Sequence, residues 1–186
     1  EILFFDGAMG TELQSRGLQT GEIPETWNIL QPEKIKQVHK EYLRAGANVI
    51  SANTFGVNSF KCRNMEYSVE QLVSAGINLV KESIAEVREE LLEQGGKEET
   101  LPTMYTALDI GSLGKLLKPL GEIAFDQAYE AFKEIIIAGD KAGADVVLIE
   151  TVSALIHKFP FFIRHDHWAF YSKSYSRSGV IGNIPT

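Results

Sequence analysis

The sequence predicts an α/β protein built on a parallel β-sheet, and three observations lead to that class. Short apolar runs alternate with longer stretches of helical periodicity, which is the order typical of βαβ units. A ten-residue phrase occurs twice, because residues 45–54 and 142–151 align without a gap and share Ala, Gly, Ala, Val and Thr at matching positions. Such a repeat indicates two copies of one helix–glycine–strand unit. Each predicted strand ends in a polar residue: Asp6, Asn53, Asp109 and Glu150.

The first third of the chain contains two predicted strands joined by one helix. The apolar run Ile2-Leu3-Phe4-Phe5 predicts the first strand, and residues 12–31 predict an irregular excursion rich in turn residues. Pro32 suits a first helical turn, and Gly46 suits the end of that helix. We place His39 on the charged, solvated face of this helix. The predicted inward stripe is Ile35, Val38, Tyr42 and Leu43.

Two further helix–strand units follow. Ser68, with Gln71 three residues later, predicts a capping box at the start of a long helix that ends at Gly95-Gly96. Residues 104–108 predict the third strand, and residues 114–121 a long loop. Asp126 is the predicted N-cap of the third helix, which leads through Gly143 into the strand at 146–149. The predicted inward face of the long helix is Leu72, Ala75, Leu79, Ile84, Val87 and Leu91.

Composition limits the classes of partner and compartment. The chain has 186 residues, 44% of them hydrophobic, and a formal net charge of -7, which gives a nucleic-acid partner no electrostatic support. No apolar run approaches the ~20 residues of a membrane helix, and no signal peptide is visible. The single cysteine, Cys62, fits a reducing cytosol. We expect one cytoplasmic domain or a piece of a larger protein, with sequence missing before Glu1.

The alternation of strands and helices fits either a doubly wound sheet or half of a (β/α)8 barrel. Polar residues at all four strand ends favour the barrel, because a barrel collects its active-site residues from strand ends around one face. An unrelated barrel enzyme acting on phosphorylated substrates lacks support, since the chain has no glycine-rich phosphate loop with its lysine.

Four motifs lie at the predicted strand ends and in the loop after the third strand. They are Asp6-Gly7-Ala8-Met9-Gly10-Thr11, Asn53-Thr54-Phe55-Gly56, Asp109-Ile110-Gly111-Ser112 with Leu117-Lys118-Pro119-Leu120-Gly121-Glu122, and Leu148-Ile149-Glu150-Thr151. In this order, over residues 2 to about 155, they resemble the homocysteine S-methyltransferase family, in particular the branch that includes the cobalamin-dependent methionine synthases.

The resemblance implies a parallel (β/α)8 TIM-type barrel, of which residues 1–155 would form the first half, about four βα units. It implies a methyltransferase that methylates the thiol of homocysteine to give methionine. The family binds zinc through cysteine thiolates. The methyl donor would be methylcobalamin carried by other modules, or another methyl donor, as in relatives. The expected partners are homocysteine, the missing half of the barrel, and cobalamin and folate modules.

The resemblance also implies a substrate site. Zinc would deprotonate the thiol, whose ordinary pKa of ~8.5 leaves little thiolate at neutral pH, and the substrate ammonium requires carboxylates. Asp6 and Glu150 match family positions that contact homocysteine, with Gly7 allowing close approach, and Asn53 and Thr54 line the same pocket in support. Alternatives stay open: Asp6 as a turn former, Glu150 as a helix cap or the partner of a surface lysine, and Asn53 and Thr54 as partners of loop backbone.

The end of the chain departs from the family. Residues 156–186 predict an irregular tail, of the kind that a frameshift or an unrelated insertion would produce, and the cysteine pair that ligates zinc in the family is absent. We assign no metal role to Cys62, nor to His165 and His167, and no catalytic residue to this chain. The chain is therefore expected to be truncated before the zinc ligands. The alternative is a non-catalytic fragment that binds an amino acid weakly or pairs with the missing half-barrel.

Overall fold

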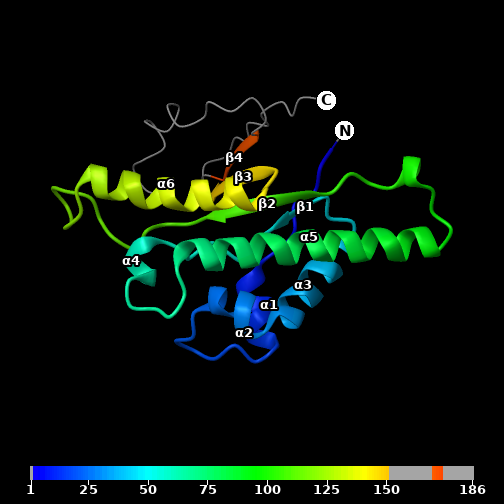
Figure 1. Cartoon of the computed structure of the whole chain (residues 1–186), viewed down its shortest axis with the longest axis horizontal. Helices are drawn as coiled ribbons and strands as arrows, with labels where there is room; N and C mark the ends of the chain where they lie inside the picture. Colours follow the sequence, from blue (N-terminus) through cyan, green and yellow to red (C-terminus); the bar gives the residue numbers. More distant parts are fainter. Residues whose placement is uncertain (1, 151–168, 174–186) are drawn as a thin grey trace.

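The computed structural model describes residues 2–150 and the backbone of residues 169–173. Its elements in chain order are α1 (Met9–Ser15), η1 (Pro24–Thr26), α2 (Trp27–Leu30), α3 (Pro32–Arg44), β1 (Val49–Ser51), α4 (Ser59–Cys62), α5 (Val69–Glu93), η2 (Glu98–Thr100), β2 (Tyr105–Ile110), α6 (Phe125–Ala142), β3 (Val146–Glu150) and β4 (Ala169–Lys173). The described strands form one parallel sheet in the order β1-β2-β3-β4. Figure 1 shows the long helix α5 lying between α3 and α6. The predicted α/β class is confirmed.

The repeated phrase forms the same structure in both copies. A glycine with a positive φ follows each helix, at 98° for Gly46 after α3 and 77° for Gly143 after α6. In both copies the amide of the next residue donates to the carbonyl five residues earlier at 3.0 Å, which closes the last helical turn as in a Schellman motif. The repeat is therefore a structural unit that reverses the chain from a helix into a parallel strand.

The residue before each repeated strand ties it to the preceding strand. The side chain of Asn48 accepts a hydrogen bond from the amide of Phe4 at 3.2 Å. The side chain of Asp145 accepts one from the amide of Thr106 in β2 at 2.8 Å. An amide and a carboxylate occupy matching positions because both supply an oxygen to a neighbouring backbone N–H.

The predicted first strand is shorter than expected. Its regular pairing is a single parallel bridge between Phe5 and Val49, continued by a hydrogen bond from the Asp6 amide to the Val49 carbonyl at 3.0 Å. Among the described strands, β1 is the one that pairs with this segment. Ile2 and Phe4 are 78% and 62% exposed.

The two faces of the sheet have different coverings. Alternate side chains of a strand point to opposite faces, and one face packs against α5 and α6 through Ile50, Leu108 and Val147. The other face carries Val49, Ala107, Val146 and Leu148, joined by Leu3, Phe5 and Tyr105, and no described helix residue belongs to this second cluster. The helices in the described part of the chain thus cover one face, whereas a doubly wound sheet has helices on both faces.

Residues 12–31 are more regular than predicted. Instead of an irregular excursion they include most of α1, together with η1 and α2. These short helices form because Leu13 and Trp27 supply apolar side chains that pack with Ile35 and Val38 of α3 in a separate core cluster. Gly17 and Gly21, with φ of 103° and 93°, separate the helical turns.

Of the two predicted helix N-caps, one is wrong and one is confirmed. Ala124, not Asp126, is the N-cap of α6, so Asp126 is the second residue of the helix. The Ala124 amide donates to the side chain of Gln127, the third residue of the helix, at 2.8 Å. The capping box of Ser68 and Gln71 is present at the start of α5.

The prediction of a solvated His39 is also wrong. Its side chain is fully buried, and neither ring nitrogen has a hydrogen-bond partner among the described residues. Burial lowers the pKa of His39 to about 3. Positions 35, 38, 39, 42 and 43 follow one helical stripe, so the periodicity places residue 39 inside whatever its polarity.

The predicted tail lies mostly outside the described residues. This applies to the boundary at residue 155 and to His165 and His167. Residues 169–173 are an exception, since β4 pairs in parallel with β3. Among the described helices, none combines the length and the apolar character needed to cross a membrane.

Candidate functional site

A pocket of about 310 Å³ opens at the carboxyl ends of the strands. It lies beyond the sheet face that carries Val49, Ala107 and Leu148, because Ser51, Asp109 and Glu150 continue the same alternation at the ends of β1, β2 and β3. Of the predicted site residues, the structure brings Asp6, Gly7, Asn53 and Glu150 to this pocket. The lining residues are Phe5, Asp6, Gly7, Ala8, Met9, Ser51, Ala52, Asn53, Phe55, Asp109, Leu148 and Glu150.

Asp6 is held at the pocket by the neighbouring strand end. Its two carboxylate oxygens accept hydrogen bonds from the amide and the hydroxyl of Ser51, at 2.9 and 2.8 Å. Burial raises the pKa of Asp6 from 3.8 to about 6; the negative charge of Glu150 adds to the rise, while the Ser51 hydrogen bonds oppose it. Asp6 is therefore a carboxylate that a bound cation would stabilise in its ionised form.

The ionisable side chains that line the pocket are all acidic. In the part of the chain that the structure describes, its lining holds the three carboxyl groups of Asp6, Asp109 and Glu150 and no lysine, arginine or histidine. Glu150 is partly buried at the last position of β3. Carboxylates gathered in a partly buried cleft attract a positively charged ligand group such as an ammonium.

Asn53 and Thr54 are bound mainly to the protein itself. The Asn53 side-chain amide donates to the Pro24 carbonyl at 2.9 Å and to the Asn28 side chain at 3.0 Å. Thr54 is fully buried, and its hydroxyl donates to the Asp109 carbonyl at 2.8 Å. Asn53 lines the pocket, whereas Thr54 lies outside its lining and fixes the end of β1 against β2.

Gly7 is required by a contact within the protein. A Cβ at this position would lie 2.7 Å from the hydroxyl oxygen of Tyr42 and 3.0 Å from its ring carbon Cζ. The Tyr42 hydroxyl also donates to the Ala8 carbonyl at 3.3 Å. The absence of a side chain thus lets the loop after the first strand pack against α3, in addition to forming a wall of the pocket.

Sequence reasoning missed Ser51 and Phe55 as lining residues. Ser51 occupies the position in the repeated phrase that Leu148 occupies in the second copy, and both line the pocket. The repeat was therefore a usable signal for Ser51. Phe55 belongs to a motif quoted above, and its carbonyl accepts a hydrogen bond from the Gly111 amide at 3.0 Å. A Cβ on Gly111 would lie 2.6 Å from the Phe55 ring, so that glycine makes room for Phe55.

The described residues do not fit the thiolate zinc centre that the family resemblance implies. They contain no group of three or more His, Cys, Asp or Glu side chains arranged to hold a metal ion. Cys62 is the one cysteine of the chain. It is half-buried at the end of α4, and burial raises the pKa of its thiol, which opposes formation of a thiolate ligand.

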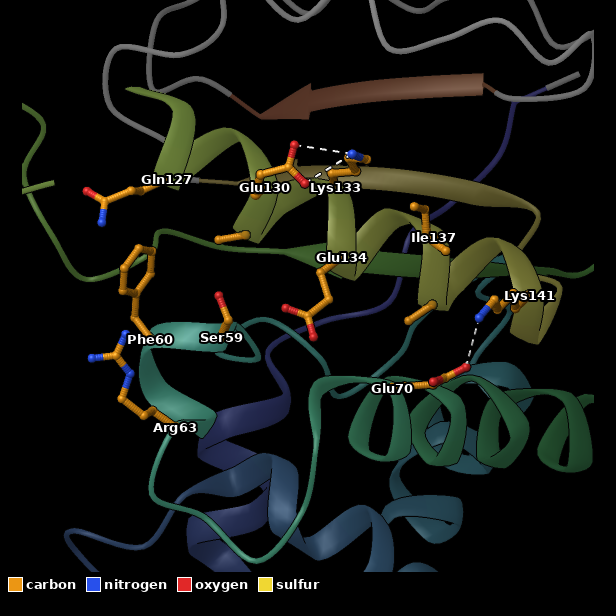
Figure 2. A pocket seen from close by; sticks show the side chains of 12 residues that line it. Ser59, Phe60, Arg63, Glu70, Gln127, Glu130, Lys133, Glu134, Ile137 and Lys141 are labelled. Carbon is orange, nitrogen blue, oxygen red and sulfur yellow. Dashed lines mark hydrogen bonds and ion pairs between the residues drawn. The ribbon is translucent and has the colours of Figure 1, made fainter. Parts of the chain in front are cut away.

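A second hollow, of about 580 Å³, lies between α4, the start of α5 and α6. Figure 2 shows charged side chains of both signs around it. Two of its acids are paired with lysines, Glu130 with Lys133 at 3.0 Å and Glu70 with Lys141 at 3.1 Å. This balance contrasts with the acidic pocket at the strand ends, so the acidic pocket is the stronger candidate for binding a cation.

Comparison with known proteins assigns the chain to a family. The family model of homocysteine S-methyltransferase matches residues 3–157. Methionine synthase of Mycobacterium leprae is 27% identical over 163 residues, which cover 83% of this chain and 13% of that protein. Methionine synthase of Mycobacterium tuberculosis is 26% identical over the same length and coverage.

Solved structures show the same fold. The oxidised form of the homocysteine methyltransferase MmuM from Escherichia coli matches with a TM-score of 0.67 and 22% identity, covering 81% of this chain and 53% of that one. Its metallated form gives a TM-score of 0.66 and 23% identity, covering 81% and 54%. The chain thus spans about half the length of this enzyme and about an eighth of the methionine synthases. On the match to residues 3–157, the chain belongs to the homocysteine S-methyltransferase family.

Proposed function

We propose that the pocket at the strand ends binds the amino-acid end of homocysteine, whose thiol is then methylated to give methionine. The observation that carries the proposal is the convergence of Asp6 and Glu150 on one pocket whose lining has three carboxyl groups and no basic side chain. Family membership supplies the substrate. An ammonium group matches the charge of this pocket, and no other part of homocysteine is cationic.

Each site residue has a distinct part in the proposal. Asp6 and Glu150 accept hydrogen bonds from the ammonium, and such charge-assisted bonds are about twice as strong as neutral ones. Gly7 and Asn53 form walls beside these carboxylates. Thr54 acts indirectly, because its hydrogen bonds with Asp109 hold the ends of β1 and β2 together.

We further propose that residues 1–155 form the first half of a (β/α)8 barrel. The sequential strand order and the helices on one face support this architecture. So does the match that covers 53% of the MmuM chain. In this architecture the pocket lies at the carboxyl-terminal face, where barrels hold their active sites. The other half of the barrel and the cobalamin and folate modules are proposed partners.

No step of the proposal passes through zinc or methylcobalamin. The metallated form of MmuM shows that this relative takes up a metal, but the described residues of this chain do not fit a zinc centre. The chain's own contribution is therefore binding and orientation: the acidic pocket fixes the amino-acid end of the substrate. The thiol must reach its thiolate form to attack a methyl group, since the thiolate is the nucleophile.

Isothermal titration calorimetry tests the proposed ligand. The full chain is titrated at pH 7.5 with L-homocysteine and, as a matched control, with 4-mercaptobutanoate, which keeps the thiol and the carboxylate but lacks the amino group. We expect homocysteine to bind at least about tenfold more tightly, because a hydrogen bond to a charged group contributes about 1.5–3 kcal/mol. Equal affinity for the two ligands would refute the role of the acidic pocket.

A further inference from the structure

The clearest unassigned contact at the pocket joins two neighbouring strand ends. Asp6 follows the Phe5 bridge, and Ser51 is the last residue of β1. Both protons that Ser51 can donate go to Asp6: the amide to Oδ2 at 2.9 Å and the hydroxyl to Oδ1 at 2.8 Å. Two donors from one residue fix both the position and the plane of the carboxylate.

We propose that Ser51 is a positioning residue for the substrate ammonium, acting through Asp6, which it keeps oriented and ionised at the pocket. This inference rests on the proposed function. An ionised carboxylate offers about four acceptor sites, so the two Ser51 hydrogen bonds leave capacity on both oxygens for a ligand. Asp6 itself lines the pocket, which gives the ligand access to that capacity.

The ionisation of Asp6 is a balance that Ser51 shifts. Burial disfavours the charged carboxylate, and the charge of Glu150 on β3 acts in the same direction; the Ser51 donors oppose both, and the resulting pKa of Asp6 is about 6. Asp109 of β2 faces the same pocket. Tyr42 of α3 lies against the loop that carries Asp6, and burial raises the pKa of its phenol, so Tyr42 stays neutral in this range.

The substitution Ser51→Ala tests how the Ser51 hydroxyl affects the pKa of Asp6 and the affinity for homocysteine. In Ser51→Ala the backbone donor remains and the hydroxyl donor is lost, so we expect the pKa of Asp6 to rise above about 6. A tenfold gain in the proton affinity of Asp6 would correspond to about 1.4 kcal/mol. After a tenfold gain in proton affinity, homocysteine affinity should fall about fivefold more at pH 6 than at pH 8, because the ionised fraction of Asp6 decreases substantially only at the lower pH, whereas the loss of orientation acts at both. Ser51→Thr keeps the hydroxyl and should restore both the pKa of Asp6 and the affinity for homocysteine.

The Asp6 pKa is measured by NMR titration of its side-chain carboxyl carbon in the full chain, without ligand. Ser59→Ala, a change in the second hollow, is the matched control and should leave the pKa unchanged. If Ser51→Ala does not fold, the unaltered chain still decides: the Ser51 amide proton should titrate with the midpoint of Asp6. An unshifted Asp6 pKa in folded Ser51→Ala, or a Ser51 amide that does not titrate, overturns the inference.

Calorimetry across pH then separates this inference from the proposed function. If the pKa of Asp6 shifts but homocysteine does not bind at any pH, the proposed function fails while the Ser51–Asp6 contact stands. If homocysteine binds with the same pH dependence in Ser51→Ala as in the unaltered chain, the positioning role of Ser51 is wrong while the proposed function stands.

Discussion

Glu150→Gln removes one negative charge from the acidic pocket and leaves its shape nearly unchanged. Glu150 shares the pocket with Asp6 and Asp109. Replacing a charge-assisted hydrogen bond, worth about 1.5–3 kcal/mol, by a neutral one of about 0.5–1.5 kcal/mol should cost about 1–2 kcal/mol. Homocysteine affinity should therefore fall about five- to thirtyfold.

Glu150→Gln also has an effect that favours homocysteine binding, through the pKa of Asp6. Measuring at pH 7.5 makes this effect negligible. The charge of Glu150 helps to raise the pKa of Asp6 to about 6, so the substitution lowers that pKa and favours ionised Asp6. At pH 7.5 Asp6 is already about 97% ionised, so the loss of the direct contact dominates there.

The assay is calorimetric titration with L-homocysteine at pH 7.5. The matched control is Glu130→Gln, the same chemical change on α6, where Glu130 pairs with Lys133 beside the second hollow. We expect the control to bind as the unaltered chain does. Unchanged affinity in Glu150→Gln would refute the ammonium contact, and an equal loss in both variants would show that net charge, not the pocket, governs binding.

Two further predictions concern stability. Gly7→Ala should destabilise the chain by about 1–3 kcal/mol, because its Cβ would lie 2.7 Å from the Tyr42 hydroxyl oxygen. A Cβ on Gly10 in α1 would meet no atom within 4 Å, so Gly10→Ala should stabilise the chain by about 0.5–1 kcal/mol. Urea denaturation measures the change in stability of both variants. Equal changes in the two variants would contradict the packing argument. For His39, whose folded pKa is about 3 against an ordinary 6.5, the unfolded chain binds the additional proton. The free energy of unfolding should therefore fall as the pH drops from about 6.5 to about 3, by at most about 4–5 kcal/mol. Asp6, with its raised pKa, opposes this by about 3 kcal/mol between pH 3.8 and about 6. His39→Leu should remove the loss of unfolding free energy that His39 causes on acidification, and urea denaturation across this pH range measures it. The same loss on acidification in the variant and in the unaltered chain would contradict a buried, neutral imidazole.

Much of the fold was predictable because local sequence and tertiary packing agree. The glycine after each repeated helix, Gly46 or Gly143, adopts the positive φ that its position in the repeat predicts. Ser68 and Gln71 form the predicted capping box. The apolar run at 146–149 forms most of β3, whose middle is buried on both faces.

The errors arose where tertiary context outweighed residue type. His39 is buried because it occupies the inward stripe of α3, although its polarity suggested exposure. Asp126 is a good capping residue by type, but the helix begins two residues earlier than predicted, with Ala124 as its N-cap. Residues 12–31 contain turn formers, yet the packing of Leu13 and Trp27 stabilises short helices there.

The candidate site was predictable in its place but not in its detail. Asp6 and Glu150, two strand-end residues that the family resemblance indicated, line one pocket. Sequence does not reveal which strand ends hydrogen-bond to one another, so the contact of Ser51 with Asp6 required coordinates. Coordinates were also required to show that the Thr54 hydroxyl donates to the Asp109 carbonyl.

A crystal structure of the full chain with L-homocysteine tests the central claim most directly. The claim predicts the substrate amino nitrogen within hydrogen-bonding distance, about 2.7–3.2 Å, of carboxylate oxygens of both Asp6 and Glu150. A homocysteine whose amino group points away from both carboxylates, or one bound in the hollow beside α6, would contradict it.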